Sequence, residues 1–286
     1  MDHALPRQLG VVGLGLMGGS LARAAKARDP AVQVVAVEPS ADVRRQALSE
    51  GVADVAVAEP GPELRGCGVT VLCTPIAAIE ALLAPVSRQL ADGAVLSDVG
   101  GAKERVVALA AREVRPGVEF VGAHPMFGGH GGYAGARADR WRGGTVAVCT
   151  EAGATAVDRV AGLHAALGAT VVRCGASEHD AAVAVVSHLP YLVASALAVA
   201  AREAGPLAIR LAGPGFRDMT RLAQFPFDIQ GEVARRNGRL PAAAERLRAH
   251  LAGVLAAIAD SPEAARGALE DARTAREALY PSGGGG

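Results

Sequence analysis

The chain has 286 residues, of which 50% are hydrophobic and 20% charged, so it can bury a large core and is neither disordered nor fibrous. Its 29 Lys and Arg residues balance 29 Asp and Glu residues, which leaves no basic surface for nucleic acid and no polybasic membrane anchor. We therefore expect a small-molecule ligand, and neither nucleic acid nor membrane as a partner.

Short β-branched apolar segments alternate with helical patterns through the first 175 residues. Strands buried on both faces are predicted at 9–13, 32–37, 69–73, 94–99, 119–123 and 145–149. Alternation of strands and helices is typical of βαβ units and a parallel sheet. The sequence therefore predicts an α/β fold with a first domain over residues 1–175.

The remaining residues, 176–286, read as a second, all-helical domain. Helices are predicted at 178–203, about 217–237, 241–259 and 262–279. Ser177 and Asp180 resemble a capping box at the start of the first helix, and Pro190 should kink it.

Residues 181–201 carry no charge, which is long enough to span a bilayer. Many of these residues are weakly apolar alanines, and Ser187, His188 and Pro190 fall in the middle, where a membrane span tolerates them least. We expect instead a helix buried on all sides in a soluble protein, with a subunit interface as one source of that burial.

A glycine motif follows the first predicted strand directly and opens a helix. Its residues are Gly13-Leu14-Gly15-Leu16-Met17-Gly18. Gly13 permits the tight turn, Gly15 lets the backbone approach a pyrophosphate, and Gly18 lets helix and strand pack closely. The helix N-terminus offers free N–H groups to the phosphates, so we predict a Rossmann-type dinucleotide-binding domain.

An acidic residue, Glu38, ends the second predicted strand 20 residues beyond Gly18. A carboxylate there accepts hydrogen bonds from the adenosine ribose and repels a 2′-phosphate, which favours NAD over NADP. Arg44 and Arg45 could reach a 2′-phosphate, but we expect them on an exposed helix face.

The ends of the predicted strands should hold the chemistry, because ligands of open α/β sheets bind there. These ends carry Cys73-Thr74-Pro75, Asp98 with the loop to Lys103, and His124. His124 is the candidate general base, since its strand end faces the cofactor and histidine titrates near neutral pH. The other histidines are weaker candidates for the base. His3, His164 and His250 have no polar groups predicted nearby, and His179 is predicted to cap a helix start. His188 is interpreted as a core residue, and His130 stays unassigned in a loop that could act as a lid.

Several motifs together resemble the prephenate/arogenate dehydrogenase family. They are the glycine motif, CTPI, SDVGGAK, GAHPMFGG, ARADRW, EHDAAVAVVSHLP and FRDMTR, and they cover residues 9 to 225. The resemblance implies an NAD(P)-binding domain followed by a helical domain that forms a homodimer. It also implies oxidative decarboxylation of a cyclohexadiene, with hydride passing from C4 to nicotinamide and the ring becoming aromatic.

The resemblance also implies roles for individual residues. His124 would take the proton of the C4 substituent as hydride leaves, and Arg221 would bind a substrate carboxylate. Ser187 and His188 would line the substrate pocket. Thr74, Pro75 and Asp98 would lie beside the nicotinamide half of the cofactor, and no residue is predicted to bind a metal.

Two positions depart from the family pattern. The family generally reads D-x-G-S-x-K, with a serine serving the C4 hydroxyl, where this chain has Gly101. The family's SHLPH ends here in Tyr191. An amine at C4 would be its own donor, so we expect 4-amino-4-deoxyprephenate as substrate and 4-aminophenylpyruvate as product. Prephenate or arogenate is the alternative, with a water filling the space left by the serine.

Other classes fit less well. β-Hydroxyacid dehydrogenases need a lysine on the helical domain, and no lysine follows Lys103. An inactive NAD-sensing protein is compatible with Gly101. The four cysteines form no CxxC pair, and the N-terminus shows no apolar signal segment, so we expect a cytoplasmic protein. Few residues follow the last predicted helix, so we expect no regulatory amino-acid-binding domain of the kind that some family members carry.

Overall fold

A computed structural model describes residues 5–129 and 131–280 of the chain. It forms two compact units, residues 1–238 and 239–286. The first unit contains every strand of the described chain, together with the helices up to α10 (Glu232–Arg236). The boundary that the sequence predicts between residues 175 and 176 marks the change from strands to helices, and as a domain boundary it stays a prediction.

A six-stranded sheet, parallel as the sequence predicts, forms the centre of the first unit in the order β3-β2-β1-β4-β5-β6. The sequence did not predict β3, and the strand it predicts at 145–149 belongs to another sheet. Its strands are β1 (Gln8–Val12), β2 (Gln33–Val37), β3 (Val55–Val57), β4 (Val69–Leu72), β5 (Val95–Asp98) and β6 (Glu119–Val121). The strand order reverses between β1 and β4. Such a switch point opens a crevice at the carboxyl ends of the strands.

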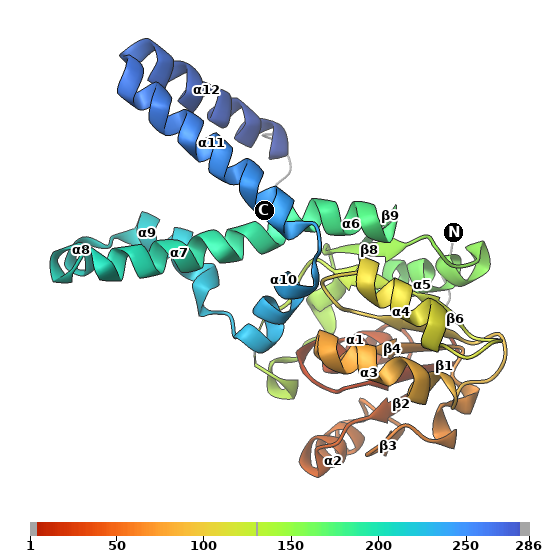
Figure 1. The fold of residues 1–286 in the computed structure, drawn as a ribbon. Coiled ribbons are helices and arrows are strands. Elements are labelled where there is room, and N and C mark those ends of the chain that lie inside the picture. Colours follow the sequence, from red (N-terminus) through yellow and green to blue (C-terminus); the bar gives the residue numbers. More distant parts are fainter. Residues whose placement is uncertain (1–4, 130, 281–286) are drawn as a thin grey trace. The chain divides into compact units, whose positions relative to one another are not determined.

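Helices cover both faces of this sheet (Figure 1). They are α1 (Leu16–Arg28), α2 (Ala41–Ser49), α3 (Ile76–Ser87), α4 (Glu104–Glu113) and α5 (Ala154–Ala166). Consecutive strand residues point to opposite faces, so Val11 and Val71 join one apolar core while Val12 and Leu72 join the other. Burial on both faces explains the continuous apolar runs of these strands.

A second, three-stranded sheet corrects the predicted strand assignment. It consists of β7 (Ala123–Pro125), β8 (Thr145–Cys149) and β9 (Thr170–Cys174), with β7 antiparallel and β9 parallel to β8. The run predicted as one strand at 119–123 divides at Gly122 between the two sheets. A Cβ at Gly122 would lie 3.2 Å from both Lys103 Cδ and Val107 Cγ2, so the absent side chain leaves room for this crossing. The apolar pattern could not show the change, because the apolar run continues across Gly122 from Phe120 to Ala123.

The long uncharged helix is interrupted where Pro190 predicts a disturbance. It runs as α6 (Ala176–Val183), a π-helical turn (Ala184–His188) and α7 (Leu189–Glu203). Proline lacks the N–H that an α-helix would use, and the wider turn directly before it accommodates this loss. The predicted capping box is wrong: the Glu178 carboxylate accepts from the N–H of Gly175 at 2.8 Å, and Asp180 turns into the core.

The expectation that this helix is buried on all sides is also wrong for the single chain. The stretch Ala176–Glu203 has a mean hydropathy of 1.9 in its most apolar window and could cross a membrane by length and composition, yet only 28% of that window is buried. Val186, Leu192 and Val199 are exposed. Contacts within the described chain therefore do not explain its apolar sequence.

The predicted helix at 217–237 is divided into short segments. They are α9 (Pro214–Thr220), a 3-10 turn (Arg221–Gln224), a π-helical turn (Phe227–Gly231) and α10. A short helix that the sequence did not predict, α8 (Pro206–Leu211), precedes them. Pro226 forces the preceding Phe225 into an extended conformation, which ends the helical run. The second unit is a hairpin of α11 (Leu240–Asp260) and α12 (Pro262–Leu279), close to the predicted bounds.

Candidate active site

The glycine loop between β1 and α1 has the geometry that its sequence predicts. Gly13 has a φ of +91°, a left-handed conformation that favours glycine. A Cβ at Gly18 would lie 1.8 Å from the carbonyl oxygen of Gly13, so helix and strand can approach only because the side chain is absent. A Cβ at Gly15, by contrast, would meet no atom of the described chain within 4 Å. The loop thus leaves open space beside Gly15, at the N-terminus of α1.

Glu38 lies just beyond the end of β2 and faces the same loop. Its carboxylate accepts hydrogen bonds from the N–H groups of Leu14 and Ser40, both at 2.9 Å. Arg44 donates to the backbone carbonyls of Glu38 and Pro39, at 2.6 and 2.8 Å. Arg45 is exposed and pairs with Asp42. Neither arginine is placed as a free phosphate-binding group.

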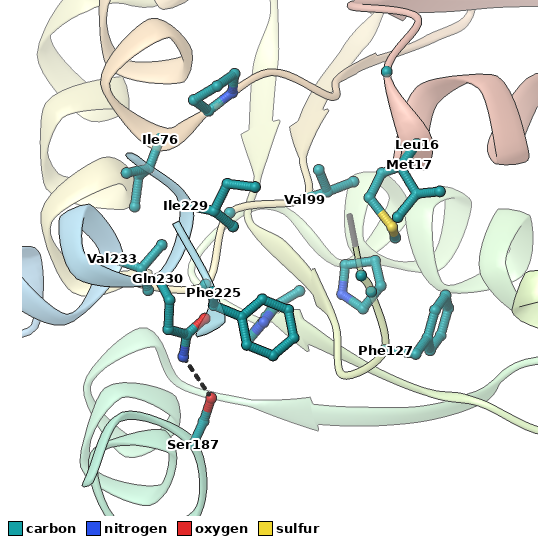
Figure 2. Close-up of a pocket in the computed structure, with 18 of the residues that line it drawn as sticks. Leu16, Met17, Ile76, Val99, Phe127, Ser187, Phe225, Ile229, Gln230 and Val233 are labelled. Carbon is teal, nitrogen blue, oxygen red and sulfur yellow. Dashed lines mark hydrogen bonds between the residues drawn. The ribbon is translucent and has the colours of Figure 1, made fainter. Parts of the chain in front are cut away.

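A cavity of about 630 Å³ lies at the crevice between the strand ends and the helices that follow (Figure 2). The predicted site residues that line it are Gly15, Leu16, Met17, Thr74, Pro75, Gly101, His124, Ser187, His188 and Tyr191. One side is therefore formed by the glycine loop and the end of β4, and the other by β7, the π-helical turn and α7. Gly13, Leu14, Gly18 and Glu38 support the loop from outside the cavity lining.

Thr74 adds a polar group to the side formed by the glycine loop. Its buried Oγ1 has no hydrogen-bond partner within the described chain, and Thr74 lines the cavity two residues before the start of α3. Buried hydroxyls are normally hydrogen-bonded. This oxygen is therefore available to a ligand or a water molecule in the cavity.

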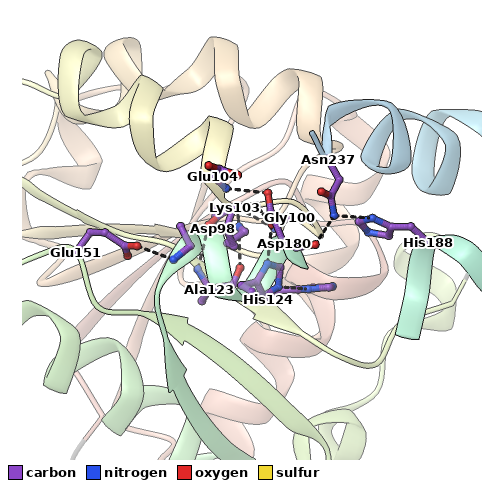
Figure 3. A network of polar contacts seen from close by, with 12 residues as sticks. Asp98, Gly100, Lys103, Glu104, Ala123, His124, Glu151, Asp180, His188 and Asn237 are labelled. Carbon is purple, nitrogen blue, oxygen red and sulfur yellow. Dashed lines mark hydrogen bonds and ion pairs between the residues drawn. The ribbon is translucent and has the colours of Figure 1, made fainter. Parts of the chain in front are cut away.

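His124 stands on β7, within the second sheet, and lines the cavity. Its Nδ1 lies 2.9 Å from Nε2 of His179, and Nδ1 of His179 lies 2.8 Å from Oδ1 of Asp180 (Figure 3). The sequence interpretation of His179 as a mere helix cap is therefore wrong. His179 is buried and contacts the candidate base, although the two residues are 55 positions apart.

The pKa of His124 is lowered well below the usual value for histidine. Burial disfavours the charged ring, and the neighbouring His179, Lys103 and His188 act in the same direction. The imidazole is consequently neutral at physiological pH. A neutral ring has one nitrogen lone pair ready to accept a proton.

Asp98 does not itself line the cavity, and its place beside the nicotinamide stays a prediction. It is fully buried and pairs with the fully buried Lys103. Its carboxylate also accepts from the N–H groups of Gly100 at 2.8 Å and Ala123 at 3.1 Å, and Lys103 Nζ donates to the Ala123 carbonyl at 3.0 Å. The pair thereby joins the loop after β5 to β7, directly before His124.

His188 is buried in the π-helical turn and is held by Asn237, which the sequence interpretation missed. Asn237 Nδ2 lies 3.0 Å from His188 Nδ1 and donates to the Asp180 carbonyl at 2.7 Å (Figure 3). Burial lowers the pKa of His188 to about 4, and this effect outweighs the opposite influence of the Asp180 carboxylate. His188 is therefore a neutral hydrogen-bonding group in the cavity wall.

Gly101 lies against both the candidate base and α10. A Cβ on Gly101 would lie 3.4 Å from His124 Nε2 and 2.8 Å from Val233 Cγ1. The water expected in the space of the absent serine thus competes with a valine methyl group. No local sequence pattern shows this contact, because Val233 is 132 positions away along the chain.

Of the remaining predicted substrate-binding residues, two line the cavity and one does not. Ser187 Oγ accepts a 3.5 Å hydrogen bond from Gln230, and Tyr191 lines the cavity one turn further along α7. Arg221, expected to bind a substrate carboxylate, is exposed and does not line the cavity, although the neighbouring Leu222 does. His130 lies outside the described residues.

Comparison with known proteins matches both halves of the chain to one family. Residues 21–173 match the prephenate dehydrogenase nucleotide-binding domain, and residues 175–264 match the prephenate dehydrogenase dimerization domain. A prephenate dehydrogenase of Bacillus subtilis is 29% identical over 220 residues, which are 74% of this chain and 59% of the relative. The chain thus spans about three-fifths of that curated relative's length.

Solved structures agree on the fold. The arogenate dehydrogenase of Synechocystis has a TM-score of 0.83 at 28% identity, with 95% of this chain and 99% of that chain covered. The prephenate dehydrogenase of A. aeolicus, solved with hydroxyphenyl propionate and NAD+, has a TM-score of 0.87 at 21% identity, with 95% and 98% covered. Since the two family models together cover most of its length, the chain belongs to the prephenate dehydrogenase family.

Proposed function

We propose that this chain is a dinucleotide-dependent dehydrogenase that oxidatively decarboxylates a prephenate-like cyclohexadiene, with prephenate or arogenate as the substrate. The observation that carries this proposal is the single cavity that has a dinucleotide-type glycine loop on one side and His124 on the other. The relatives support the substrate class, since they are named as prephenate and arogenate dehydrogenases.

The residues on the glycine-loop side fit a dinucleotide. The open space at Gly15 admits a pyrophosphate, the N–H groups at the start of α1 can bind it, and Thr74 Oγ1 is available to the ligand. A bound nicotinamide supplies a hydride acceptor. We infer NAD rather than NADP, because the Glu38 carboxylate would repel a 2′-phosphate while Arg44 and Arg45 are engaged elsewhere. NAD+ bound in the A. aeolicus structure supports the same class of cofactor.

His124 acts as the base and then as the acid. As hydride leaves C4, the proton of the C4 hydroxyl passes to His124 and a carbonyl forms at C4. The bond from the ring to its carboxylate then breaks, carbon dioxide departs, and the bonding pair moves through the ring to the C4 oxygen. That oxygen takes back the proton from His124, which balances the reaction and leaves an aromatic phenol.

A second candidate substrate is 4-amino-4-deoxyprephenate, which the surroundings of Gly101 favour. No hydroxyl donor stands there, and the Val233 methyl group makes the space beside His124 Nε2 apolar. An amine at C4 brings its own N–H donor and does not need a serine hydroxyl. The comparisons favour prephenate or arogenate over this amine, so we place it second.

The test is NADH or NADPH formation with prephenate, arogenate and 4-amino-4-deoxyprephenate offered in parallel under NAD and NADP. Turnover of prephenate or arogenate with NAD supports the proposal. Turnover of the amine alone replaces it with the second candidate, and no turnover of any of the three contradicts both. His124→Ala serves as the control for contaminating dehydrogenases.

We also propose a homodimer formed through the exposed apolar face of α7. The dimerization-domain match covers this helix, and Leu192 and Val199 are exposed on it. Leu192→Asp should convert the dimer to a monomer in sedimentation velocity. Leu48→Asp, an equally exposed leucine on α2, is the matched control and should leave the dimer intact. A dimer that survives Leu192→Asp contradicts this interface.

A further inference from the structure

Three side chains form a continuous hydrogen-bonded row that ends at the candidate base. Asp180 and His179, consecutive in α6, extend from His124 into the core, and all contacts in the row are shorter than 3 Å. Asp180 is fully buried and His179 is nearly so. Residues in such a row influence one another's protons directly.

Asp180 is held as a carboxylate, and therefore accepts hydrogen bonds only. Burial by itself opposes its ionisation, but His179 and the backbone N–H groups of Lys103 and Glu104 donate to it, and together they keep its pKa below the usual range. The two N–H groups lie 2.7 and 3.0 Å from its oxygens, at the start of α4. Asp180 is thus anchored by the helix start that it caps.

The proton positions along the row follow from this anchor. Because Asp180 only accepts, Nδ1 of His179 carries the proton of their hydrogen bond, and we take Nε2 of His179 as the acceptor that faces His124. His124 Nδ1 must then donate to it. The lone pair of His124 is left on Nε2, the atom that faces Gly101 at 3.4 Å from the Cβ position.

We propose that His179 and Asp180 are positioning residues that hold the His124 proton on Nδ1, so that Nε2 faces the cavity as the proton acceptor. This role rests on the proposed function of His124 as the base. When Nε2 takes the substrate proton, the resulting imidazolium keeps its Nδ1 hydrogen bond, and the Asp180 carboxylate stabilises its charge through His179. The same hydrogen bonds remain in place when Nε2 returns the proton.

The groups that face His124 make this arrangement necessary. Burial disfavours a positive charge on the ring most strongly, and His179 from α6, Lys103 from the segment before α4 and His188 from the π-helical turn act in the same direction. The row to Asp180 links the ring to a negative charge on the side away from the cavity. A purely structural role for His179 would not require its ring nitrogen to meet Nδ1 of His124.

The first experiment determines the tautomer of His124 by NMR in the absence of substrate. The protein is labelled with ¹⁵N-histidine, two-bond ¹⁵N–¹H correlations are recorded near neutral pH, and the His124 signals are assigned with His124→Asn. We expect the Nδ1–H tautomer in the wild type and its loss in His179→Leu, which removes the acceptor. An Nε2–H tautomer in the wild type, or an unchanged tautomer in His179→Leu, overturns the proposal.

The matched control is His164→Leu. His164 is another fully buried histidine, which accepts a 2.9 Å hydrogen bond from Trp141 outside the cavity. We expect this variant to lower Tm while leaving the His124 tautomer unchanged. A change of tautomer in His164→Leu would mean that general loosening of the core moves the proton, and would also overturn the proposal.

Kinetics then separate positioning from folding. His179→Gln keeps an amide oxygen that can accept from His124 Nδ1, so it should retain at least tenfold more kcat than His179→Leu, with KM for both substrates nearly unchanged. Equal kcat for the two variants contradicts the proposal. If the wild type oxidises none of the cyclohexadienes, the proposed function fails, but the tautomer measurement still decides this inference.

Discussion

The two sides of the cavity are built in different ways. The side formed by the glycine loop comes mainly from one βαβ unit of about 30 consecutive residues, joined by the end of β4. The opposite side consists of side chains from β7, the π-helical turn, α7 and α10, which lie far apart in the sequence. The first side depends on where side chains are absent, and the second on where distant side chains meet. Substitutions should therefore harm the two sides by different mechanisms.

The largest effect is expected on the side-chain side, from His124→Ala. Loss of the base should lower kcat by about 10³-fold, within the range usual for general acid–base groups. Cofactor affinity should stay within about twofold of wild type, since the glycine loop is untouched. Steady-state kinetics and titration calorimetry with NAD measure the two quantities. Full activity of His124→Ala would remove the basis of the proposed mechanism.

On the side formed by the glycine loop, substitutions of two glycines should have different effects. Gly18→Ala places a Cβ against the Gly13 carbonyl and should destabilise folding by more than about 2 kcal/mol. Gly15→Ala enters open space and should leave Tm unchanged while weakening NAD binding about tenfold or more. Thermal denaturation and calorimetry of the two variants test this contrast. An equal loss of stability in the two variants would contradict the predicted difference between Gly18 and Gly15.

Substrate preference should follow the contact between Gly101 and Val233. Gly101→Ser alone should lower turnover of every substrate, because its Cβ overlaps a Val233 methyl group. Adding Val233→Ala should relieve the overlap and raise the ratio of kcat/KM for prephenate over the amine by about tenfold. Val233→Ala alone is the control for the enlarged cavity. An identical ratio in wild type and double variant would show that this contact does not select the C4 substituent.

The smallest effect expected is a pH dependence of stability that arises on the side-chain side. The pKa of His188 is about 4 in the folded chain, against about 6.5 in an unfolded one, so the unfolded state binds more protons below pH 6.5. This contribution to stability should be complete above that pH and decline by about 1.4 kcal/mol for each pH unit below it, until about pH 4. His188→Gln should have a shallower decline of Tm between pH 6.5 and 5. Equal slopes would show that His188 does not contribute.

The pH dependence of turnover separates the two candidate substrates. With the pKa of His124 below its usual value, the base is available throughout the neutral range, so turnover of a hydroxyl substrate should be flat there. An amine must be unprotonated to push electrons toward C4, so its turnover should rise with pH through the ammonium pKa. A flat profile with the amine would contradict that reading.

The residues that spacing alone could place and those that the sequence missed also lie on opposite sides of the cavity. Gly13, Gly18 and Glu38 could be placed from spacing alone, because a tight βαβ turn determines its own backbone within a short segment. His179 and Asp180 could not, since one meets a strand 55 positions earlier and the other caps a helix 76 and 77 positions earlier. The available signal was the run of polar residues from Ser177 to Asp180 at the start of a long apolar stretch.

By itself, the sequence determined the parallel sheet and the glycine loop, because hydrophobic periodicity and turn geometry are local properties. The tertiary structure alone decided that β7 leaves the parallel sheet, that Val233 occupies the space beside Gly101, and that His179 and Asp180 stand behind His124. These are contacts between segments that are distant in the chain. Their formation depends on how the whole core packs, which no local pattern contains.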